Sequence, residues 1–309
     1  MSFHVGTVAL VGRPNAGKSS ILNCLLGERL AAVSSRPQTT RNRVVGIHST
    51  EELQAVILDT PGIHEAWTPL NESMVHVTES ALEEVDFATW IVDAVPLVTA
   101  AKNGLPILDK SLQAIADKLP PDILVALNKV DVIKEKDWLL PVIAAFAPRE
   151  VIPVSAKSKE GIAKLEAAWY RRLPEGEPLY PTDIYTDATE RFVVAELIRE
   201  RVMEHTSDEV PYATAVEVER FDESLREAGR VQIHAKILVE KVGQKAIVIG
   251  KGGAMIKQIG IEARKSIEAL LGCHVRLELF VVVEEGWTTN PRMLKELGYT
   301  PPKKKVTTR

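Results

Sequence analysis

The run Gly12-Arg-Pro-Asn-Ala-Gly-Lys-Ser19 has the residue types and spacing of a phosphate-binding loop, G-x-x-x-x-G-K-[ST]. Its glycines allow backbone N–H groups to turn toward phosphate oxygens, Lys18 reaches the terminal phosphates, and Ser19 binds Mg²⁺. The loop lies where the predicted strand Thr7–Val11 ends and a predicted helix begins, which is the context such a loop requires. The predicted phosphate-binding residues are Asn15, Ala16, Gly17, Lys18, Ser19, Ser20 and Gly62.

A second polar run, Asp59-Thr-Pro-Gly62, directly follows the predicted strand Leu53–Leu58. This position puts Asp59 at the carboxyl edge of the sheet, where it can hold a magnesium-bound water. Gly62 leaves a backbone N–H free to meet the γ-phosphate. We therefore predict that Asp59 and Ser19 share the magnesium site.

The base of the nucleotide is predicted from Asn128-Lys-Val-Asp131, which follows the predicted strand Ile123–Leu127. A carboxylate at Asp131 accepts two hydrogen bonds from the N1–H and amino group of guanine. Adenine lacks this pair of donors, and a buried carboxylate facing adenine would stay unpaired at a large cost. Ser155-Ala-Lys157 follows the strand Val151–Val154 and offers N–H groups to the guanine carbonyl. The predicted guanine-binding residues are Asn128, Lys129, Asp131, Ser155, Ala156 and Lys157.

These runs are positioned by strands that alternate with helical patterns up to about Arg172, as in a doubly wound α/β domain. Three prolines between Pro174 and Pro181 then remove backbone donors and disfavour helix. We predict a nucleotide-binding domain over 1–173, a linker over 174–182 and a second domain over 183–309.

The second domain is predicted to have the order α-β-β-α-α-β. Period-two alternation marks its strands and helical spacing marks its helices. The predicted elements are a helix over Thr189–Glu204, strands over Ala213–Phe221 and Val231–Val239, helices over Ala254–Gln258 and Ile261–Leu271, and a strand over Val275–Val283.

Within this domain, Gly250-Lys-Gly-Gly253 matches the G-x-x-G loop that clamps the backbone of four nucleotides of RNA. Ile249, Ile256 and Ile259 are candidates for an apolar floor under the bases, although isoleucines at this spacing are also typical of a protein core. The predicted RNA-binding residues are Ile249, Gly250, Lys251, Gly252, Gly253, Ile256 and Lys257.

The charge distribution supports this assignment. The 309-residue chain has 38 basic and 42 acidic residues, a net charge of −4. Between Gly229 and Arg276, however, nine basic residues face three acidic ones, a local +6, which leaves 29 basic against 39 acidic elsewhere. One basic patch on an acidic chain indicates an anionic partner for that patch. The run Pro301–Arg309 adds a short basic tail that could contact phosphate or lipid headgroups.

Composition excludes several classes of protein. The chain has 45% hydrophobic and 26% charged residues, which suits a folded globular protein. No apolar stretch approaches the 18 or more residues of a membrane span, and the first residues lack the layout of a secretion signal. Two cysteines cannot build a disulfide framework, so we expect a cytoplasmic protein.

The phosphate loop, D-T-P-G, N-K-V-D and S-A-K, in this order, resemble the translation-factor-related GTPases over about the first 170 residues. One such domain followed by the α-β-β-α-α-β unit with its glycine loop resembles bacterial ribosome-assembly GTPases with a C-terminal type II KH domain. This resemblance implies hydrolysis of GTP with Mg²⁺ and binding of 16S rRNA near its 3′ end during assembly of the small ribosomal subunit. It also implies a monomer with peripheral contact to the inner face of the cell membrane.

The resemblance further implies a switch. In Gln38-Thr-Thr-Arg41, Thr40, with Thr39 as the alternative, stands where the family caps Mg²⁺. Ile63 occupies the place of a water-orienting glutamine, so intrinsic hydrolysis is expected to be slow. Asn15 matches relatives that hold K⁺ there, its alternative being a simple turn residue. The predicted switch residues are Thr39, Thr40, Asp59, Thr60, Pro61, Gly62 and Ile63.

Two other functions would use parts of the same sequence. A GTP-regulated membrane or cell-division scaffold would use the second domain to dock a protein, which the +6 patch and the glycine loop disfavour. An ATPase or kinase would share only the phosphate loop, and Asn128-Lys-Val-Asp131 argues against adenine.

Overall fold

The computed structural model describes residues 2–34, 36, 38–63 and 68–299. Its contacts divide the chain into two compact units. The first comprises Met1–Leu30, Arg43–His64 and Val77–Asp187, and the second comprises Ala31–Asn42, Glu65–His76 and Ala188–Arg309. The segment that contains the first predicted switch motif, Ala31–Asn42, and the segment shortly after the second, Glu65–His76, therefore group with the carboxyl-terminal unit. The basic tail after Thr300 lies outside the described residues.

The first unit is built on a six-stranded sheet with the order β2-β3-β1-β4-β5-β6. Only the β2–β3 pair is antiparallel, and the other four pairs are parallel. Its strands are β1 (His4–Val11), β2 (Val44–Ser49), β3 (Leu53–Asp59), β4 (Phe87–Asp93), β5 (Leu124–Asn128) and β6 (Val151–Pro153). Its helices are α1 (Lys18–Leu26), α2 (Pro69–Glu84, from Val77 onward), α3 (Ala94–Lys102), α4 (Lys110–Ala116), α5 (Leu139–Ala144) and α6 (Ile162–Tyr170).

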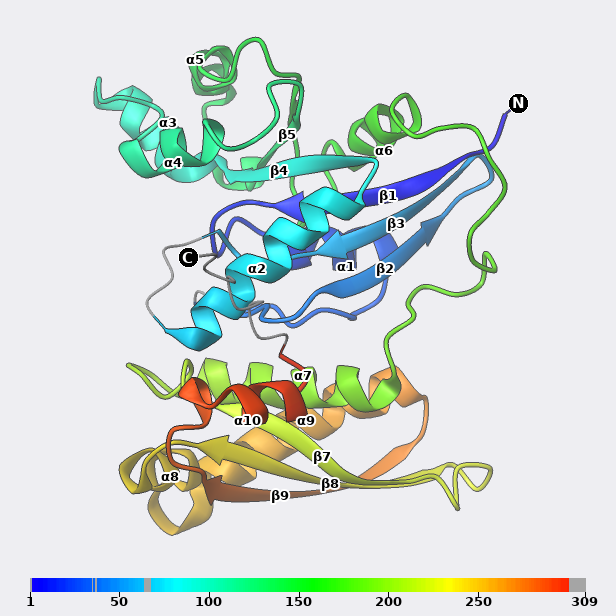
Figure 1. Cartoon of the computed structure of the whole chain (residues 1–309), viewed down its shortest axis with the longest axis vertical. Helices are drawn as coiled ribbons and strands as arrows, with labels where there is room; N and C mark the ends of the chain where they lie inside the picture. Colours follow the sequence, from blue (N-terminus) through cyan, green and yellow to red (C-terminus); the bar gives the residue numbers. More distant parts are fainter. Residues whose placement is uncertain (1, 35, 37, 64–67, 300–309) are drawn as a thin grey trace, which may run out of the picture. The chain divides into compact units, whose positions relative to one another are not determined.

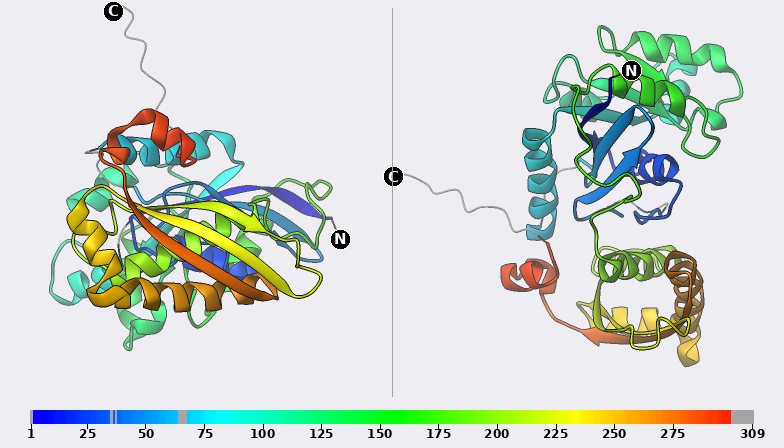
Figure 2. Two further views of the ribbon diagram at one scale, coloured as in Figure 1. Left: turned by 90° about the horizontal axis from the view of Figure 1, so that it is seen from below. Right: turned by 90° about the vertical axis from the view of Figure 1, so that its right-hand side faces the viewer.

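Helices cover both faces of this sheet, with α1 on one face and the carboxyl-terminal half of α2 on the other (Figures 1 and 2). Burial on both faces explains why β3 and β5 are buried at every residue. The doubly wound α/β fold is confirmed. Such a sheet gathers the loops that follow its parallel strands at one edge, which is where ligands bind.

The predicted linker is hydrogen-bonded to this sheet. The N–H of Val5 donates to Pro174 O at 2.9 Å, and Gln54 exchanges two hydrogen bonds with the backbone of Tyr180 at 2.8 and 2.9 Å. These bonds fasten the proline-rich segment along β1 and β3.

The second unit has a three-stranded sheet, β7-β8-β9, in which β7 and β8 are antiparallel and β8 and β9 parallel. Helices α7 and α9 cover one face of it (Figure 2). The elements are α7 (Glu190–His205), β7 (Ala215–Asp222), β8 (Arg230–Val239), α8 (Val242–Ile249), α9 (Ala254–Leu271), β9 (His274–Val283) and α10 (Pro291–Glu296). The order α-β-β-α-α-β is confirmed, with α10 added at its end.

The prediction of two helices after the glycine loop was wrong. Ala254–Leu271 is one continuous helix that runs through Gly260, and the other helix, Val242–Ile249, comes before the loop. Valine and isoleucine dominate α8, so its short apolar run has the composition of a strand. None of the described helices has the length and apolar character needed to cross a bilayer.

Candidate functional site

The phosphate loop connects the end of β1 to the start of α1. Gly17 precedes α1 with a φ of 97°, and a β-carbon there would lie 2.1 Å from Asn128 Nδ2, so only glycine fits. Lys18 begins the helix with its side chain only 6% exposed. Its ammonium donates to Gly12 O at 3.2 Å and Arg13 O at 3.1 Å. The lysine is thus folded inside the loop that it is predicted to share with phosphate.

Burial lowers the pKa of Lys18 from 10.5 to about 8, because desolvation disfavours the ammonium more than the negative charge of Asp59 favours it. Nucleotide phosphates bind the charged form. As the pH rises through about 8, the free protein loses this proton, and binding must then restore it. Nucleotide affinity should therefore fall roughly tenfold between about pH 7 and about pH 9.

Titration of GDP at both pH values checks this expectation. The matched variant is Lys18→Arg, whose guanidinium stays charged throughout the range. The GDP affinity of this variant should be the same at both pH values, whatever its absolute value. Equal GDP affinities of the unmodified protein at both pH values would show that the pKa of Lys18 lies outside this pH range.

Ser19 and Asp59 lie together beside the loop. The Ser19 hydroxyl donates to Asp59 Oδ2 at 2.5 Å, and the Asp59 side chain is fully buried. Hydroxyl and carboxylate oxygens are the donors that Mg²⁺ prefers, so this pair fits the predicted metal. Lys18, Ser19 and Asp59 thus lie where β1 ends, α1 begins and β3 ends, at one edge of the sheet.

The remainder of the second run packs directly against the phosphate loop. Thr60 is buried and donates to Leu10 O at 2.8 Å, while the N–H of Ile63 donates to Gly12 O at 2.9 Å. A β-carbon at Gly62 would lie 2.5 Å from Pro14 N. The side chain of Ile63 packs on the apolar core. This packing agrees with the expectation that Ile63 orients no water.

The residues predicted for guanine meet at the ends of β5 and β6. Asn128 links the motifs, because its amide donates to Ala16 O at 2.9 Å and its oxygen accepts from the N–H of Ala156 at 3.2 Å. The buried Ser155 hydroxyl donates to Asp131 Oδ1 at 2.7 Å. Asp131 itself is exposed. Its carboxylate is therefore oriented from one side and open to a ligand from the other.

Lys129 and Lys157 complete this group. Lys129 adopts a φ of 66°, and its ammonium lies 2.6 Å from the carboxylate of Asp93. Sequence reasoning missed Asp93, although it ends β4 between the strands that carry the other motifs. Lys157 is exposed.

The two switch threonines belong to the second unit. Thr39 and Thr40 are each 9% exposed. The Thr39 hydroxyl donates to Arg36 O at 2.9 Å, and its carbonyl accepts from the Arg199 guanidinium of α7. Arg41, 2% exposed, donates to the carbonyls of Pro211, Tyr212 and Thr214 at 2.7 to 3.0 Å. The segment 31–42 is thus hydrogen-bonded to the unit that carries the glycine loop.

The glycine loop lies between α8 and α9. Gly250 has a φ of 71° and ψ of 172°, and a β-carbon there would lie 2.6 Å from Met255 Cβ. Gly252 and Gly253 also have positive φ, 61° and 79°, but face open space. Gly253 caps α9 without a side-chain hydrogen bond, so the first N–H groups of an 18-residue helix remain available to phosphate. Lys251 is exposed beside them.

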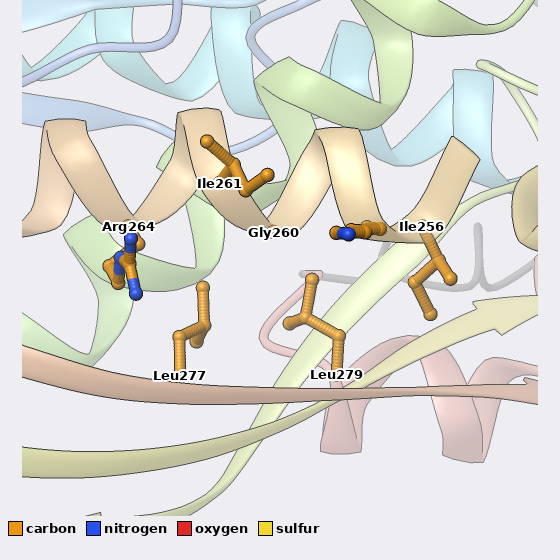
Figure 3. A pocket seen from close by; sticks show the side chains of 7 residues that line it. Ile256, Gly260, Ile261, Arg264, Leu277 and Leu279 are labelled. Carbon is orange, nitrogen blue, oxygen red and sulfur yellow. The ribbon is translucent and has the colours of Figure 1, made fainter. Parts of the chain in front are cut away.

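A groove of about 320 Å³ lies between α9 and β9. Figure 3 shows Ile256 and Arg264 projecting from α9 toward Leu277 and Leu279 of β9, with Gly260 between them. Of the predicted residues, Ile256 and Lys257 line this groove. Ile249 ends α8 and is half-buried, whereas Ile259 is fully buried, so of the two alternatives for Ile259 the structure supports a core residue.

Sequence reasoning missed the other residues that line the groove, which are Gly260, Ile261, Arg264, Leu277 and Leu279. Their signal was present. Ile256, Gly260 and Arg264 recur every four residues on one helical face, and Leu277 and Leu279 alternate on a strand. The error of splitting α9 into two helices concealed the first pattern.

Gly260 lies inside a helix, where glycine costs about 0.5–1 kcal/mol relative to alanine. A β-carbon there would lie 3.6 Å from Leu279 Cδ1, an ordinary contact that narrows the groove without a clash. Gly260→Ala should therefore raise the free energy of unfolding by about 0.5–1 kcal/mol and weaken RNA binding. Denaturant unfolding and RNA titration measure the two effects. Gly243→Ala in α8, whose added carbon meets open space, is the control and should leave RNA affinity unchanged.

These two sites define a class of protein: a phosphate-loop protein of the guanine-binding type joined to a KH unit. A family model described as a 50S ribosome-binding GTPase matches residues 7–129, and a KH domain model matches residues 209–288. The chain is 47% identical to GTPase Era of Geotalea uraniireducens over 301 residues, covering 96% of this chain and 98% of that protein. It is 44% identical to GTPase Era of Lacticaseibacillus paracasei, covering 96% and 97%.

Solved structures agree. A variant of Aquifex aeolicus Era bound to GDP·AlF4⁻ is 35% identical with a TM-score of 0.89, covering 96% of this chain and 100% of that one. Era in complex with MgGDPNP and nucleotides 1506–1542 of 16S ribosomal RNA is 34% identical with a TM-score of 0.87, covering 96% and 99%. The chain belongs to the Era family of GTPases.

Proposed function

We propose that this protein is a GTP-hydrolysing switch that binds 16S rRNA near its 3′ end and acts in assembly of the small ribosomal subunit. One observation carries the proposal: a guanine-type phosphate-loop site and a KH groove occur in one chain that belongs to the Era family. The related Era that was solved with MgGDPNP and nucleotides 1506–1542 of 16S rRNA supports both ligands. A ribosomal partner in turn favours a cytoplasmic location.

The nucleotide is held by residues at three strand ends. Lys18 supplies a buried positive charge for the terminal phosphates, and the N–H groups at the start of α1 complete the phosphate site. Asp131, held by Ser155, selects guanine. Asn128 fixes the phosphate loop and the Ser155–Lys157 loop relative to each other. Ser19 and Asp59 would hold Mg²⁺, which neutralises phosphate charge during hydrolysis when it is bound.

Potassium is proposed as a second cation, held by the carboxamide of Asn15. This residue is exposed on the phosphate loop with a φ of 61°. Ile63 packs on the core and offers no group to position water. Hydrolysis should therefore depend more on added positive charge at the phosphates than it does in GTPases with a water-orienting glutamine. Hydrolysis should be slow in NaCl and faster in KCl, and Asn15→Ala should remove the difference. Single-turnover rates in the two salts measure it; equal rates for the unmodified protein would remove potassium from the proposal.

RNA is assigned to the groove between α9 and β9. Its aliphatic walls suit bases, and its glycine loop, helix N-terminus and Lys251 suit phosphates. Assembly of the small subunit and peripheral contact with the cell membrane extend this proposal from the family resemblance. No observation in the described part of the chain favours the scaffold alternative over RNA.

A switch requires that the nucleotide state changes the affinity for RNA. The hydrogen bonds of Thr39 and Arg41 within the KH-containing unit support such coupling, because the segment predicted to sense the γ-phosphate is held by that unit. RNA affinity should differ between GDP and a non-hydrolysable GTP analogue by about 5- to 150-fold. By linkage, RNA must change the affinity ratio of the two nucleotides by the same factor. Identical RNA affinity in both states would reduce the protein to two independent binding modules.

A further inference from the structure

The chain continues past the last strand of the KH unit with a segment, 287–299, whose apolar side chains are buried. The KH domain model ends at residue 288, whereas helix α10 and Tyr299 follow it. Trp287, Leu294 and Tyr299 are all buried. The rings of Trp287 and Tyr299 stack with their centroids 6.1 Å apart. The segment 287–299 is therefore packed into the folded unit.

This segment packs on the start of α2, the helix that follows the second switch motif. Leu70 and Met74 of α2 belong to one apolar cluster with Trp287, Leu294 and Tyr299. Both α2 side chains are buried there. Because close-packed side chains leave the backbone that carries them little freedom to move, the segment 287–299 holds the start of α2 in place.

The same segment shares a loop with the first switch motif. Arg41 donates to the carbonyls of residues 211, 212 and 214, and the indole N–H of Trp287 donates to the remaining one, Ala213 O, at 3.1 Å. Four consecutive carbonyls are thus divided between one arginine and one tryptophan. Burial lowers the pKa of Arg41, and the side chain of Tyr299, which lies beside the guanidinium, opposes this shift. Trp287 and Tyr299 therefore support the surroundings of Arg41 from two directions.

Helix α7 and the turn after it hold other parts of the segment 31–42. The N–H of Val33 donates to Glu200 Oε1 at 3.3 Å, and the guanidinium of Arg36 donates to Thr206 O at 3.1 Å. In many GTPases, contacts with the γ-phosphate and Mg²⁺ supply the order of the switch segment. Here the protein's own contacts fix the backbone on both sides of Thr40. A segment that is already held loses less conformational freedom when it binds a ligand.

We propose that Trp287 and Tyr299 are positioning residues for both switch regions, and that they raise the affinity for GTP relative to GDP. They act through Arg41 and the start of α2, which they hold before the nucleotide binds. The inference rests on the proposed function, because it takes Thr40, or its alternative Thr39, as the residue that senses the γ-phosphate. GDP has no γ-phosphate, so its affinity does not depend on the position of that threonine.

Two variants of the full chain test this proposal. Trp287→Phe removes the indole N–H that binds Ala213 O but keeps an aromatic ring in the cluster. Its matched control is Trp169→Phe in α6, because Trp169 is also fully buried and its indole N–H also makes one hydrogen bond, to Thr89 Oγ1 at 2.9 Å.

Tyr299→Phe removes only the hydroxyl beside Arg41, so it should leave the packing of the ring intact. Its matched control is Tyr170→Phe at the end of α6, which removes a hydroxyl from the nucleotide-binding unit. Titration with GDP and with a non-hydrolysable GTP analogue gives the ratio of the two affinities for each protein.

Trp287→Phe and Tyr299→Phe should each bind the GTP analogue at least about fivefold more weakly, with unchanged affinity for GDP. Amide hydrogen exchange over 31–42 and 69–76 should become faster in the free variants, because both stretches lose contacts that hold them. Both controls should keep the affinity ratio of the unmodified protein, even where Trp169→Phe lowers its stability to denaturant.

An affinity ratio that is unchanged in either variant, or that shifts toward the GTP analogue, would overturn the role of that residue. If Trp287→Phe does not fold, Tyr299→Phe decides alone, since it removes a single oxygen. Failure of the unmodified protein to bind either guanine nucleotide would instead overturn the proposed function.

Discussion

Replacing Asp131 with asparagine is expected to transfer nucleotide preference from GDP and GTP to their xanthine analogues. The carboxylate is predicted to accept hydrogen bonds from the N1–H and amino group of guanine. An amide in its place points a donor at the guanine amino group, whereas xanthine has an oxygen there that accepts this donor. Sites built around such hydrogen bonds discriminate by about 10⁴-fold, so loss of GDP affinity should be of that order.

The surroundings of Asp131 should accept asparagine without other changes in the site. The side chain is exposed and is held by the Ser155 hydroxyl at 2.7 Å, a bond that the asparagine oxygen can also accept. Competitive titration with GDP and XDP gives the two affinities. Asp137→Asn, which neutralises another exposed aspartate six residues along the chain, is the control for charge alone. Unchanged preference for GDP in Asp131→Asn would place the base elsewhere.

The nucleotide site could be predicted from sequence because its chemistry is local. Each motif directly follows a buried strand, and parallel strands in one sheet bring their carboxyl ends to the same edge. Asn128 and Asp131 therefore reach Ala16 and Ser155 without any long loop having to fold in a particular way. The contact of Lys129 with Asp93 escaped prediction, because Asp93 belongs to no motif and is brought there only by strand order.

The position of the switch segment could not be predicted in the same way. Arg41 reaches carbonyls that lie about 170 residues further along the chain, and neither partner carries a sequence signature. Backbone carbonyls are the same in every residue, so the pattern of side chains does not reveal which of them bind an arginine. The guanidinium is fully inside the protein, and burial lowers its pKa. Such a buried cation depends on these carbonyls for its stabilisation.

In the KH-containing unit, the fold was predicted more accurately than its groove. Gly260 misled the sequence analysis, because an isolated glycine in a helical pattern is also a signal for a helix end. In the structure α9 continues through this glycine, and a β-carbon there would make only an ordinary contact with Leu279. Reading α9 as one helix places Ile256, Gly260 and Arg264 on one face, and the groove follows from that face.

Gly252→Asp is expected to abolish RNA binding almost entirely and to leave nucleotide affinity unchanged. The residue has a φ of 61° and a ψ of 23°, and a β-carbon there would meet no atom within 4 Å. Aspartate tolerates this left-handed conformation better than most residues, so the loop should keep its shape. The new carboxylate would then stand beside Lys251 and the N-terminus of α9, where RNA phosphates are proposed to bind.

The matched variant is Gly252→Asn, which has the same size and the same tolerance for positive φ but no charge. Hindered approach of the RNA backbone is common to both variants, so the difference between them isolates repulsion of phosphate. A like charge placed against one phosphate should separate them by at least about tenfold at low salt, and the separation should shrink as salt screens the charge. Titration of the RNA segment 1506–1542 at several salt concentrations, with GDP affinity measured in parallel, gives both quantities. Equal RNA affinity for the two variants would mean that no phosphate lies against Gly252, and the clamp would have to be sought at another part of α9.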